Sequence, residues 1–362
     1  MNREVVFSCP KCGFKTTKYY WRCPKCGSPL ELLYEKEWKP RGRGLLRYSS
    51  TLPFRPRKTL GEGNTPLVVR RIRGVRVFFK LEYLNPSGSF KDRGALISIS
   101  YAYLKKYKRV VEDTSGNTGI AVTMYSRLYG MKPVIVMPEY APRGKKILVK
   151  ALGGKVLETP TRGDAATKVL ELIDDDTFYV AHTWSPFFIL GSSTIAYEAF
   201  EQGFRGGTII APIGSGGLFL GLYYGFRDLY EWDKLENTPL PIGVEGVSVT
   251  PVYDKLYGKY EGGGSSSLAD GVMVPNPPRT NEIVDVLKKN HGRIILVDNN
   301  DILKGLKELY RLGFVVEPTS TLPYIALLKL LENNEVDRGE DVFIPLTGSG
   351  LKTLDVFEQY FG

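Results

Sequence analysis

The sequence predicts an α/β protein with two parallel, helix-covered sheets and a small cysteine-rich module at its N-terminus. From Val75 onward, short β-rich runs alternate with helical stretches, the pattern that produces parallel sheets covered by helices. The 362 residues exceed what one hydrophobic core usually holds, so two main domains are expected. All four cysteines lie within the first 26 residues, which sets that segment apart as a separate module.

The cysteines form two Cys-Pro-Lys-Cys pairs, each followed by glycine: Cys9, Cys12, Cys23 and Cys26. Two such turns can hold a metal ion in a tetrahedral cage of thiolates. Disulfides are the alternative, and they are disfavoured because the sequence shows no secretory signal. Four thiolates could also bind iron, but the short gap between the pairs favours Zn²⁺ in a structural role. Residues 1–36 are therefore predicted to be a zinc ribbon.

Three further segments complete the predicted organisation. Residues 37–84 are expected to be an arm and the start of a large domain, residues 85–190 a small α/β domain, and residues 191–362 the large α/β domain. The expected strands are Val75–Lys80, Arg109–Glu112, Val134–Met137, Lys155–Glu158, Thr208–Pro212, Ile242–Glu245, Ile294–Val297 and Val342–Leu346. The expected helices are Asp92–Tyr107, Gly119–Gly130, Lys145–Leu152, Gly191–Gln202, Leu218–Tyr230, Asp298–Arg311 and Ser320–Asn333. Glu261–Ser267 carries no apolar side chains, so it is predicted to be a mobile loop, and Pro275–Pro278 to be irregular.

Composition narrows the class of protein. The net charge is +10, but the Lys and Arg residues are spread along the chain with acids between them. Nucleic-acid binding is therefore not expected, whereas small anionic ligands suit such a charge. No apolar run reaches the roughly 20 residues of a membrane helix, and the N-terminus leads into no signal-like stretch. A cytoplasmic protein without a membrane partner is predicted.

The first chemical motif is Asn85-Pro-Ser-Gly-Ser-Phe-Lys91-Asp-Arg-Gly94. It delivers one lysine at the start of a predicted helix, where the positive end of the helix dipole favours a neutral amine. A neutral amine is what attacks an aldehyde. Taken alone, Lys91 reads more simply as a solvated lysine, and the catalytic interpretation depends on the motifs that follow.

The second motif is Thr114-Ser-Gly-Asn-Thr-Gly119, between a predicted strand and a predicted helix. Hydroxyl groups and helix N-terminal N–H groups make an anion site that suits a carboxylate, and Asn117 adds a donor. A simple N-cap loop is the alternative.

The third motif is Pro212-Ile-Gly-Ser-Gly-Gly-Leu218, a strand that runs through glycines into a helix. Glycines let backbone N–H groups close around a phosphate at a helix N-terminus. The spacing matches neither a Walker loop nor a Rossmann fingerprint, so a nicotinamide cofactor is disfavoured.

The fourth motif joins Glu317-Pro-Thr-Ser320 with Pro345-Leu-Thr-Gly-Ser-Gly-Leu-Lys352. A hydroxyl such as that of Thr347 can bond a neutral pyridine nitrogen. Two ordinary turn segments are the competing interpretation, and without the other motifs it is the better one.

In this order, the four motifs resemble the fold-type II pyridoxal-phosphate enzymes, the group of threonine synthase, cysteine synthase and threonine dehydratase. The resemblance covers residues 60 to 355. It implies a tryptophan synthase β-like fold of two three-layer, parallel-sheet domains with the cofactor between them. Ser89–Gly94 and Thr347–Lys352 are similar to threonine synthase, as is an N-terminal zinc ribbon, while Thr114–Ala121 is equally similar to cysteine synthase.

The resemblance also implies residue roles. Lys91 would hold pyridoxal 5'-phosphate as an aldimine and later move protons, Asn117 would bond the phenolic oxygen of the cofactor, and Thr347 would meet its ring nitrogen. The cofactor phosphate would be held by Gly214, Ser215, Gly216, Gly217 and Leu218. The amino-acid substrate would be bound by Ser115, Gly116, Asn117 and Thr118. Enzymes of this fold are usually dimers, so a homodimer is expected.

The implied reaction is the conversion of O-phosphohomoserine and water to threonine and phosphate. Two alternatives stay open: β-replacement on O-acetylserine or O-phosphoserine with sulfide, and a threonine or serine dehydratase. A binding protein without turnover would be expected to lack the lysine, which is present.

The chain departs from the threonine synthase pattern at two places. The Asn-Pro-x-Arg segment that contacts the substrate phosphate in that enzyme reads Ser185-Pro-Phe-Phe188 here, and Thr-Gly-His-Gly has become Thr347-Gly-Ser349-Gly. Substitute cations could come from Arg143, Lys145, Lys146 or Arg162, although the prediction for all four is a solvated surface position. The two histidines, His182 and His291, are interpreted as structural, because the lysine amine can serve as the base.

Overall fold

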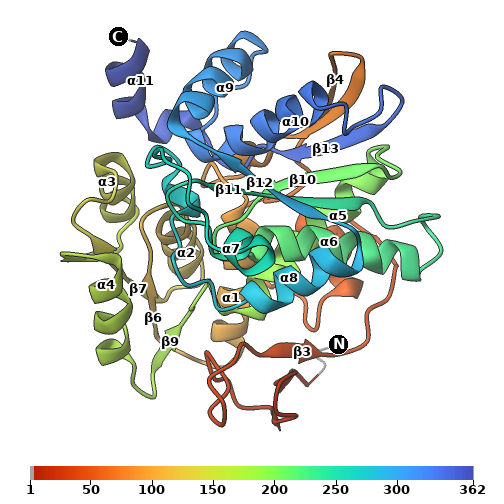
Figure 1. Ribbon diagram of the computed structural model, residues 1–362. Coiled ribbons are helices and arrows are strands. Elements are labelled where there is room, and N and C mark those ends of the chain that lie inside the picture. Colours follow the sequence, from red (N-terminus) through yellow and green to blue (C-terminus); the bar gives the residue numbers. More distant parts are fainter. Residues whose placement is uncertain (1–3, 362) are drawn as a thin grey trace. The chain divides into compact units, whose positions relative to one another are not determined.

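The protein is described here from a computed structural model that places residues 4–361. The chain forms two compact units, and neither is continuous in sequence. Unit 1 comprises the residues up to Asn64 together with Asn85–Ser192, and unit 2 comprises Thr65–Leu84 together with the chain from Ser193 onward. Figure 1 shows the elements of both units.

The N-terminal module belongs to unit 1. Its three short strands, β1 (Val6–Ser8), β2 (Lys15–Thr16) and β3 (Glu31–Leu33), form an antiparallel sheet in the order β2-β1-β3. The module is fixed by aromatic packing, because the Phe7 ring meets the rings of Tyr101 and Phe187 edge to face. The module that carries the four cysteines therefore packs on the rest of unit 1 through a buried aromatic contact.

The main sheet of unit 1 is parallel and has the order β8-β7-β6-β9. Its two faces are both buried: Val110 and Ile135 pack in one apolar cluster, whereas Val111 and Val136 pack in another that includes Ala165. This alternation creates a three-layer unit. The elements are α1 (Lys91–Leu104), β6 (Arg109–Asp113), α2 (Asn117–Leu128), β7 (Lys132–Pro138), α3 (Arg143–Ala151), β8 (Lys155–Thr159), α4 (Arg162–Lys168), β9 (Thr177–Tyr179) and the first part of α5 (Pro186–Glu201), whose residues from Ser193 onward belong to unit 2.

The sheet of unit 2 has the order β12-β11-β10-β13-β5-β4 and is parallel except for β4, which pairs antiparallel with β5 at one edge. Aliphatic residues of one face pack with Leu306 and Ile325, and an aromatic cluster around Phe204 covers the other. The strands are β4 (Leu67–Ile72), β5 (Val75–Lys80), β10 (Thr208–Pro212), β11 (Leu240–Gly246), β12 (Arg293–Val297) and β13 (Asp341–Pro345). The helices are α6 (Gly217–Glu231), α7 (Pro251–Tyr257), α8 (Thr280–Lys289), α9 (Asn299–Arg311), α10 (Leu322–Glu332) and α11 (Leu354–Phe361).

The predicted α/β class with two helix-covered parallel sheets and a small N-terminal module is confirmed. Each predicted strand and helix is present, and most have shifted ends; the first long helix, for example, ends at Leu104 and not at Tyr107. The loop Glu261–Ser267 has no helix or strand, but it is not wholly without an anchor, since Ser266 is buried and exchanges hydrogen bonds with Ser248. Between residues 4 and 361, none of the helices is both long enough and apolar enough to cross a bilayer.

Candidate functional site

Lys91 is the first residue of α1 and is half-buried. The turn before it is held by backbone-to-side-chain bonds: the Ser87 N–H donates to the Asp92 carboxylate at 2.7 Å, and the Gly63 N–H donates to the Asn85 side chain at 2.9 Å. The Lys91 ammonium nitrogen lies 4.5 Å from the centre of the Phe90 ring. The structure thus places one lysine at a helix N-terminus on a well-braced turn.

The Ser115–Thr118 segment lies in the same unit, where β6 ends and α2 begins. Ser115 and Asn117 are half-buried, and Thr118 is buried. The N-cap residue of α2 is Gly116, and its own N–H donates to the Thr114 hydroxyl at 3.1 Å. Because the N-cap carries no side chain, the amides of the first turn face their surroundings without a side-chain cap, as an anion site requires.

Buried titratable groups lie at the same end of the unit 1 sheet. The carboxylate of Glu112, near the end of β6, contacts Nδ1 of His182, which follows β9, and both side chains are buried. Burial raises the pKa of Glu112 well above its ordinary value, and the charge of Asp113 adds to this. Burial likewise lowers the pKa of His182 far below its ordinary value, with a contribution from the positive charge of Lys91. This pair was not predicted as such, since 70 residues separate its members.

Unit 2 carries the predicted phosphate loop between β10 and α6. Gly216 is the N-cap of α6 and has a φ of 89°, a left-handed conformation that favours glycine. A Cβ atom there would also meet Ile283 at 2.5 Å. Gly214, Ser215 and Gly217 are half-buried and Leu218 is buried, so a strand, a glycine turn and a helix N-terminus meet as predicted.

Thr347 is buried at the end of β13, also in unit 2. Its hydroxyl lies 2.9 Å from that of Ser320 and 3.4 Å from the Glu317 carboxylate. Thr319, the residue before Ser320, accepts a hydrogen bond from the N–H of Gly271. Gly271 in turn packs against the phosphate loop, because its carbonyl oxygen would touch a Cβ atom built on Gly214. The structure therefore links the fourth motif to the phosphate loop within one unit, a link that the sequence did not reveal.

The four cysteines converge as predicted. Their Sγ atoms all lie within 4.8 Å of one another, and each pair closes through equivalent backbone bonds, from Gly13 N–H to the Cys9 carbonyl and from Gly27 N–H to the Cys23 carbonyl. Hydrogen bonds from Ser28 lower the pKa of Cys26 to about 6, which favours its thiolate form. A set of four sulfur ligands at this spacing fits a tetrahedral Zn²⁺ ion.

The four cations considered as substitutes differ in exposure. Arg143 is exposed, and Arg162 and Lys146 are half-buried. The prediction of a surface position is wrong for Lys145, which is 1% exposed. Lys145 lies four residues before the buried Val149, so both side chains project from the same face of α3. The four-residue spacing between Lys145 and Val149 is the feature of the sequence that could have indicated that Lys145 is buried.

The two departures from the threonine synthase pattern supply no charge. Phe188 is 3% exposed and packs against Gly94 of α1. The Ser349 hydroxyl accepts from the Leu351 N–H at 3.3 Å as a local cap. His291 is exposed, whereas His182 is buried against Glu112.

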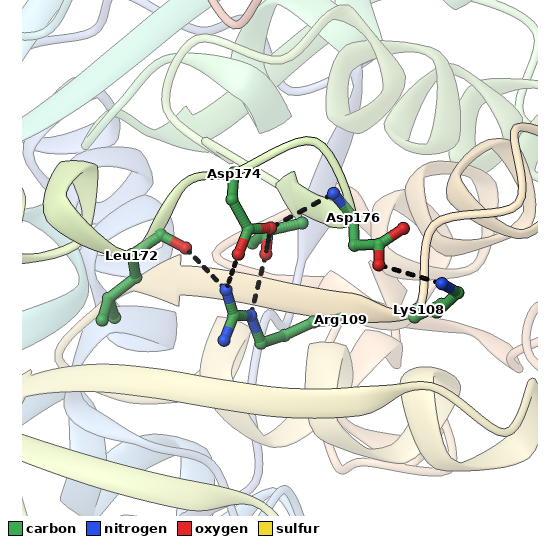
Figure 2. A network of polar contacts seen from close by, with 6 residues as sticks. Lys108, Arg109, Leu172, Asp174 and Asp176 are labelled. Carbon is green, nitrogen blue, oxygen red and sulfur yellow. Dashed lines mark hydrogen bonds and ion pairs between the residues drawn. The ribbon is translucent and has the colours of Figure 1, made fainter.

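A separate hollow of about 750 Å³ opens in unit 1 and is lined by Lys108, Arg109, Asp174 and Asp176 among others. Figure 2 shows these side chains bonded to one another: Arg109 to Asp174 and to the Leu172 carbonyl, and Lys108 to Asp176. Their charges are paired at the amino ends of the strands, and ligands of parallel sheets bind at the carboxyl ends. The candidate site is therefore the carboxyl end.

Comparison with known proteins agrees with this geometry. Residues 58–348 match the family described as pyridoxal-phosphate dependent enzyme. The chain is 29% identical over 326 residues to a threonine synthase from Bacillus sp. (strain ULM1), which covers 87% of this chain and 91% of that protein. It is 27% identical over 369 residues to a threonine synthase from Methanocaldococcus jannaschii, with 97% and 90% coverage.

Among solved structures, the O-acetylserine dependent cystathionine beta-synthase from Helicobacter pylori superposes with a TM-score of 0.68 at 24% identity, covering 81% of this chain and 95% of that one. The fold is thus that of the fold-type II enzymes. The chain belongs to the pyridoxal-phosphate dependent enzyme family, and its known relatives include threonine synthases.

The residues present fit the cofactor that this family implies. In unit 2, a glycine loop whose N-cap has no side chain precedes α6, as a phosphate requires. In unit 1, an amine stands at the first position of α1.

Proposed function

We propose that this chain is a threonine synthase-like enzyme that converts O-phosphohomoserine and water to threonine and phosphate. The observation that carries the proposal is Lys91 at the N-terminus of α1, in the same unit as the Ser115–Thr118 loop. The similarity to threonine synthases over nearly the whole of both chains supports this choice of reaction.

Each residue set has a proposed role. Pyridoxal phosphate, when bound, supplies an electron sink that eases loss of a proton from the substrate α carbon. Lys91 would hold the cofactor covalently, and its Nζ would take that proton. Asn117 would donate to the phenolic oxygen, the loop of residues 214–218 would hold the phosphate, and the Thr347 hydroxyl would bond the ring nitrogen. The Ser320 and Glu317 side chains, which contact Thr347, orient that hydroxyl.

The net chemistry is balanced by one water molecule. The substrate loses its Cα proton and a Cβ proton, and the phosphate leaves Cγ with its bonding electron pair. Water then adds its hydroxyl at Cβ, and protons return to the carbon skeleton. The Ser115–Thr118 loop holds the substrate carboxylate throughout, while the ion held by Cys9, Cys12, Cys23 and Cys26 is a structural Zn²⁺ outside the reaction.

A second candidate is β-replacement or elimination on serine-type or threonine-type substrates. The observation that favours it is Phe188: it stands where threonine synthases carry the phosphate-binding arginine, and it is buried against Gly94. A substrate without a phosphate needs no cation there.

The test is a substrate panel with the purified, cofactor-loaded protein. O-Phosphohomoserine should yield threonine and phosphate in equal amounts. O-Acetylserine or O-phosphoserine with sulfide tests for cysteine formation, and threonine or serine alone tests for keto-acid release. Cysteine or keto acid formed faster than threonine would replace the leading proposal with the second candidate.

A further inference from the structure

Lys145 of α3 is buried beside the candidate site, unlike the more exposed positive residues around it. Lys145 ranks among the largest fully buried side chains of the protein, while its neighbour Lys146 is half-buried and pairs with Glu158 at the surface at 2.7 Å. A buried ammonium is costly to desolvate. A structural or functional role is therefore expected for the buried ammonium group of Lys145.

Lys145 lies directly against the proposed substrate loop. A Cβ atom built on Gly116 would meet Cδ of Lys145 at 2.4 Å, Nζ at 3.0 Å and Cε at 3.1 Å. The 2.4 Å distance is shorter than real Cβ contacts, so any side chain at position 116 would force the stem of Lys145 to shift. Gly116 and Lys145 are thus fitted to each other.

The contact also puts charge where an anion would bind. Gly116 is the N-cap of α2, whose first-turn amides form the proposed carboxylate site. A second contact keeps α3 on the same helix, because Val149 lies 3.6 Å from where a Cβ on Gly119 would be. The ammonium of Lys145 is therefore held beside the loop by the packing of α3 on α2.

A buried lysine can also serve the fold alone, and unit 2 offers an example. The amine of Lys80 bonds to Glu198 and Gln202, each at 2.8 Å, and to the Thr65 carbonyl. That group is surrounded by structural partners in the interior of its unit. Lys145 differs in its location, against a loop that the proposed function assigns to the substrate.

We infer that Lys145 is a positioning residue for the substrate carboxylate: its stem supports the Ser115–Thr118 loop, and its ammonium makes that loop attractive to an oxyanion. The inference rests on the proposed function, which assigns this loop to the amino-acid substrate. It assigns a cation to the carboxylate end of the substrate and not to its phosphate.

The experiment compares two ligands that differ by one carboxylate. L-Threonine and 1-amino-2-propanol are titrated into the cofactor-loaded protein, and binding is followed by the change in cofactor absorbance. In Lys145→Met, the dissociation constant for L-threonine should rise about 10- to 100-fold, as expected for the loss of a charged partner. The dissociation constant for 1-amino-2-propanol should stay unchanged.

Lys146→Met is the matched control, because it removes the adjacent lysine from the half-buried position. It should leave both dissociation constants as in the natural protein. If Lys145→Met does not fold, Lys145→Gln is measured in its place, with the thermal unfolding curve as the check that the fold is intact.

A second variant approaches the same contact from the other side. Gly116→Ala introduces the methyl group that meets the Lys145 stem, so it should weaken L-threonine binding to a similar degree. In a Lys145→Ala background the clash is removed, and Gly116→Ala should then have little further effect.

Each alternative result has a distinct meaning. Equal loss of affinity for both ligands would show a purely structural role and overturn the inference, as would unchanged binding of L-threonine to Lys145→Met. A changed preference for O-phosphohomoserine over homoserine, with the carboxylate preference intact, would also overturn it. If the natural protein binds no α-amino acid at all, the proposed function itself fails.

Discussion

The two ends of strand β6 differ in whether their ionisable side chains are exposed or buried. At the amino end, Lys108 and Arg109 pair with Asp176 and Asp174 at the surface, and the Lys108 side chain is 76% exposed (Figure 2). At the carboxyl end, only a few residues away, Glu112 is buried against His182. Exposed pairs contribute little to stability, whereas buried titratable groups are costly and need compensation.

This difference in burial indicates which end of β6 faces the candidate site. The same end that carries the buried pair leads into the Ser115–Thr118 loop, and the positive charge of Lys91 influences both Glu112 and His182. Parallel sheets bind ligands at their carboxyl ends because loops and helix N-termini gather there. Unusual ionisation at one end and ordinary surface pairs at the other thus indicate which end carries the chemistry.

The largest expected effect follows from removing the lysine near the carboxyl end. Lys91→Ala should lower turnover by at least about 1000-fold, since the proposed covalent anchor and the proposed base are lost together. Borohydride reduction of the natural protein should fix the cofactor to the peptide that contains Lys91. Lys108→Ala, at the amino end, is the control and should keep full activity. Covalent cofactor in Lys91→Ala would contradict the assignment.

Metal removal should come next in size. The Tyr19 hydroxyl of the N-terminal module donates to the Tyr179 carbonyl at 2.7 Å, and the Tyr179 hydroxyl donates to Asp113. We expect about one zinc per chain, and a chelator should lower the melting temperature. Amide exchange should then quicken around Tyr179 more than around Arg109. Protein with four reduced thiols and no bound metal would argue against the ribbon.

The buried pair predicts a particular dependence of stability on pH. The raised pKa of Glu112 and the lowered pKa of His182 favour a protonated Glu112 and a neutral His182 in the folded state, so we expect the folded pair to hold one proton. In the unfolded chain it holds two protons below the ordinary glutamate pKa of 4.5, one up to the ordinary histidine pKa of 6.5, and none above that. Stability should therefore fall as the pH drops below 4.5, because the unfolded state binds more protons there.

On the alkaline side the sign reverses. Above pH 6.5 the folded pair keeps a proton that the unfolded chain releases, so stability should fall by about 1.4 kcal/mol per pH unit until Glu112 ionises in the folded state. Denaturant unfolding of the natural protein and of Glu112→Gln/His182→Asn, measured from acid to alkaline pH, checks this. The difference between the two curves should be flat at mildly acidic pH and decline on both sides; a steady slope through that range would refute the assigned protonation.

The smallest effect is expected at the amino end. Arg109→Ala removes a surface pair with Asp174, so the melting temperature should change by less than about 3 °C. The pKa of Asp174 is lowered by hydrogen bonding to Thr177 and by Arg109, so any contribution of this pair should be lost only as the pH falls below the ordinary aspartate range. A large loss of stability at neutral pH would remove the contrast between the two ends.

Local patterns in the sequence predicted most of the strands and helices of the fold. Strands buried on both faces read as short apolar runs, and β5 and β10 have the predicted bounds. The edge strand β4 escaped prediction because its residues are largely exposed and rich in arginine. The helix α8 was also not predicted, because it directly follows the proline-rich stretch Pro275–Pro278, which is typical of irregular structure.

Contacts between distant residues could not be predicted. The Glu112 and His182 pair forms because β6 and β9 are neighbours in the sheet, and sequence order does not reveal that neighbourhood. Lys145 was predicted at the surface because three of the first four residues of α3 are cations, which suggests a solvated turn. The packing of α3 against Gly116 shows that one of these cations points inward.

The place of β5 in its sheet has a consequence for how the chain is made. Residues 75–80 lie between β4 and β13, and β13 comprises residues 341–345. During synthesis, the β4–β5 hairpin leaves the ribosome long before its parallel neighbour exists, while the whole of Asn85–Ser192 is produced in between. The hairpin must wait with an unpaired edge until residues 341–345 emerge, which exposes it to misassembly in the nascent chain.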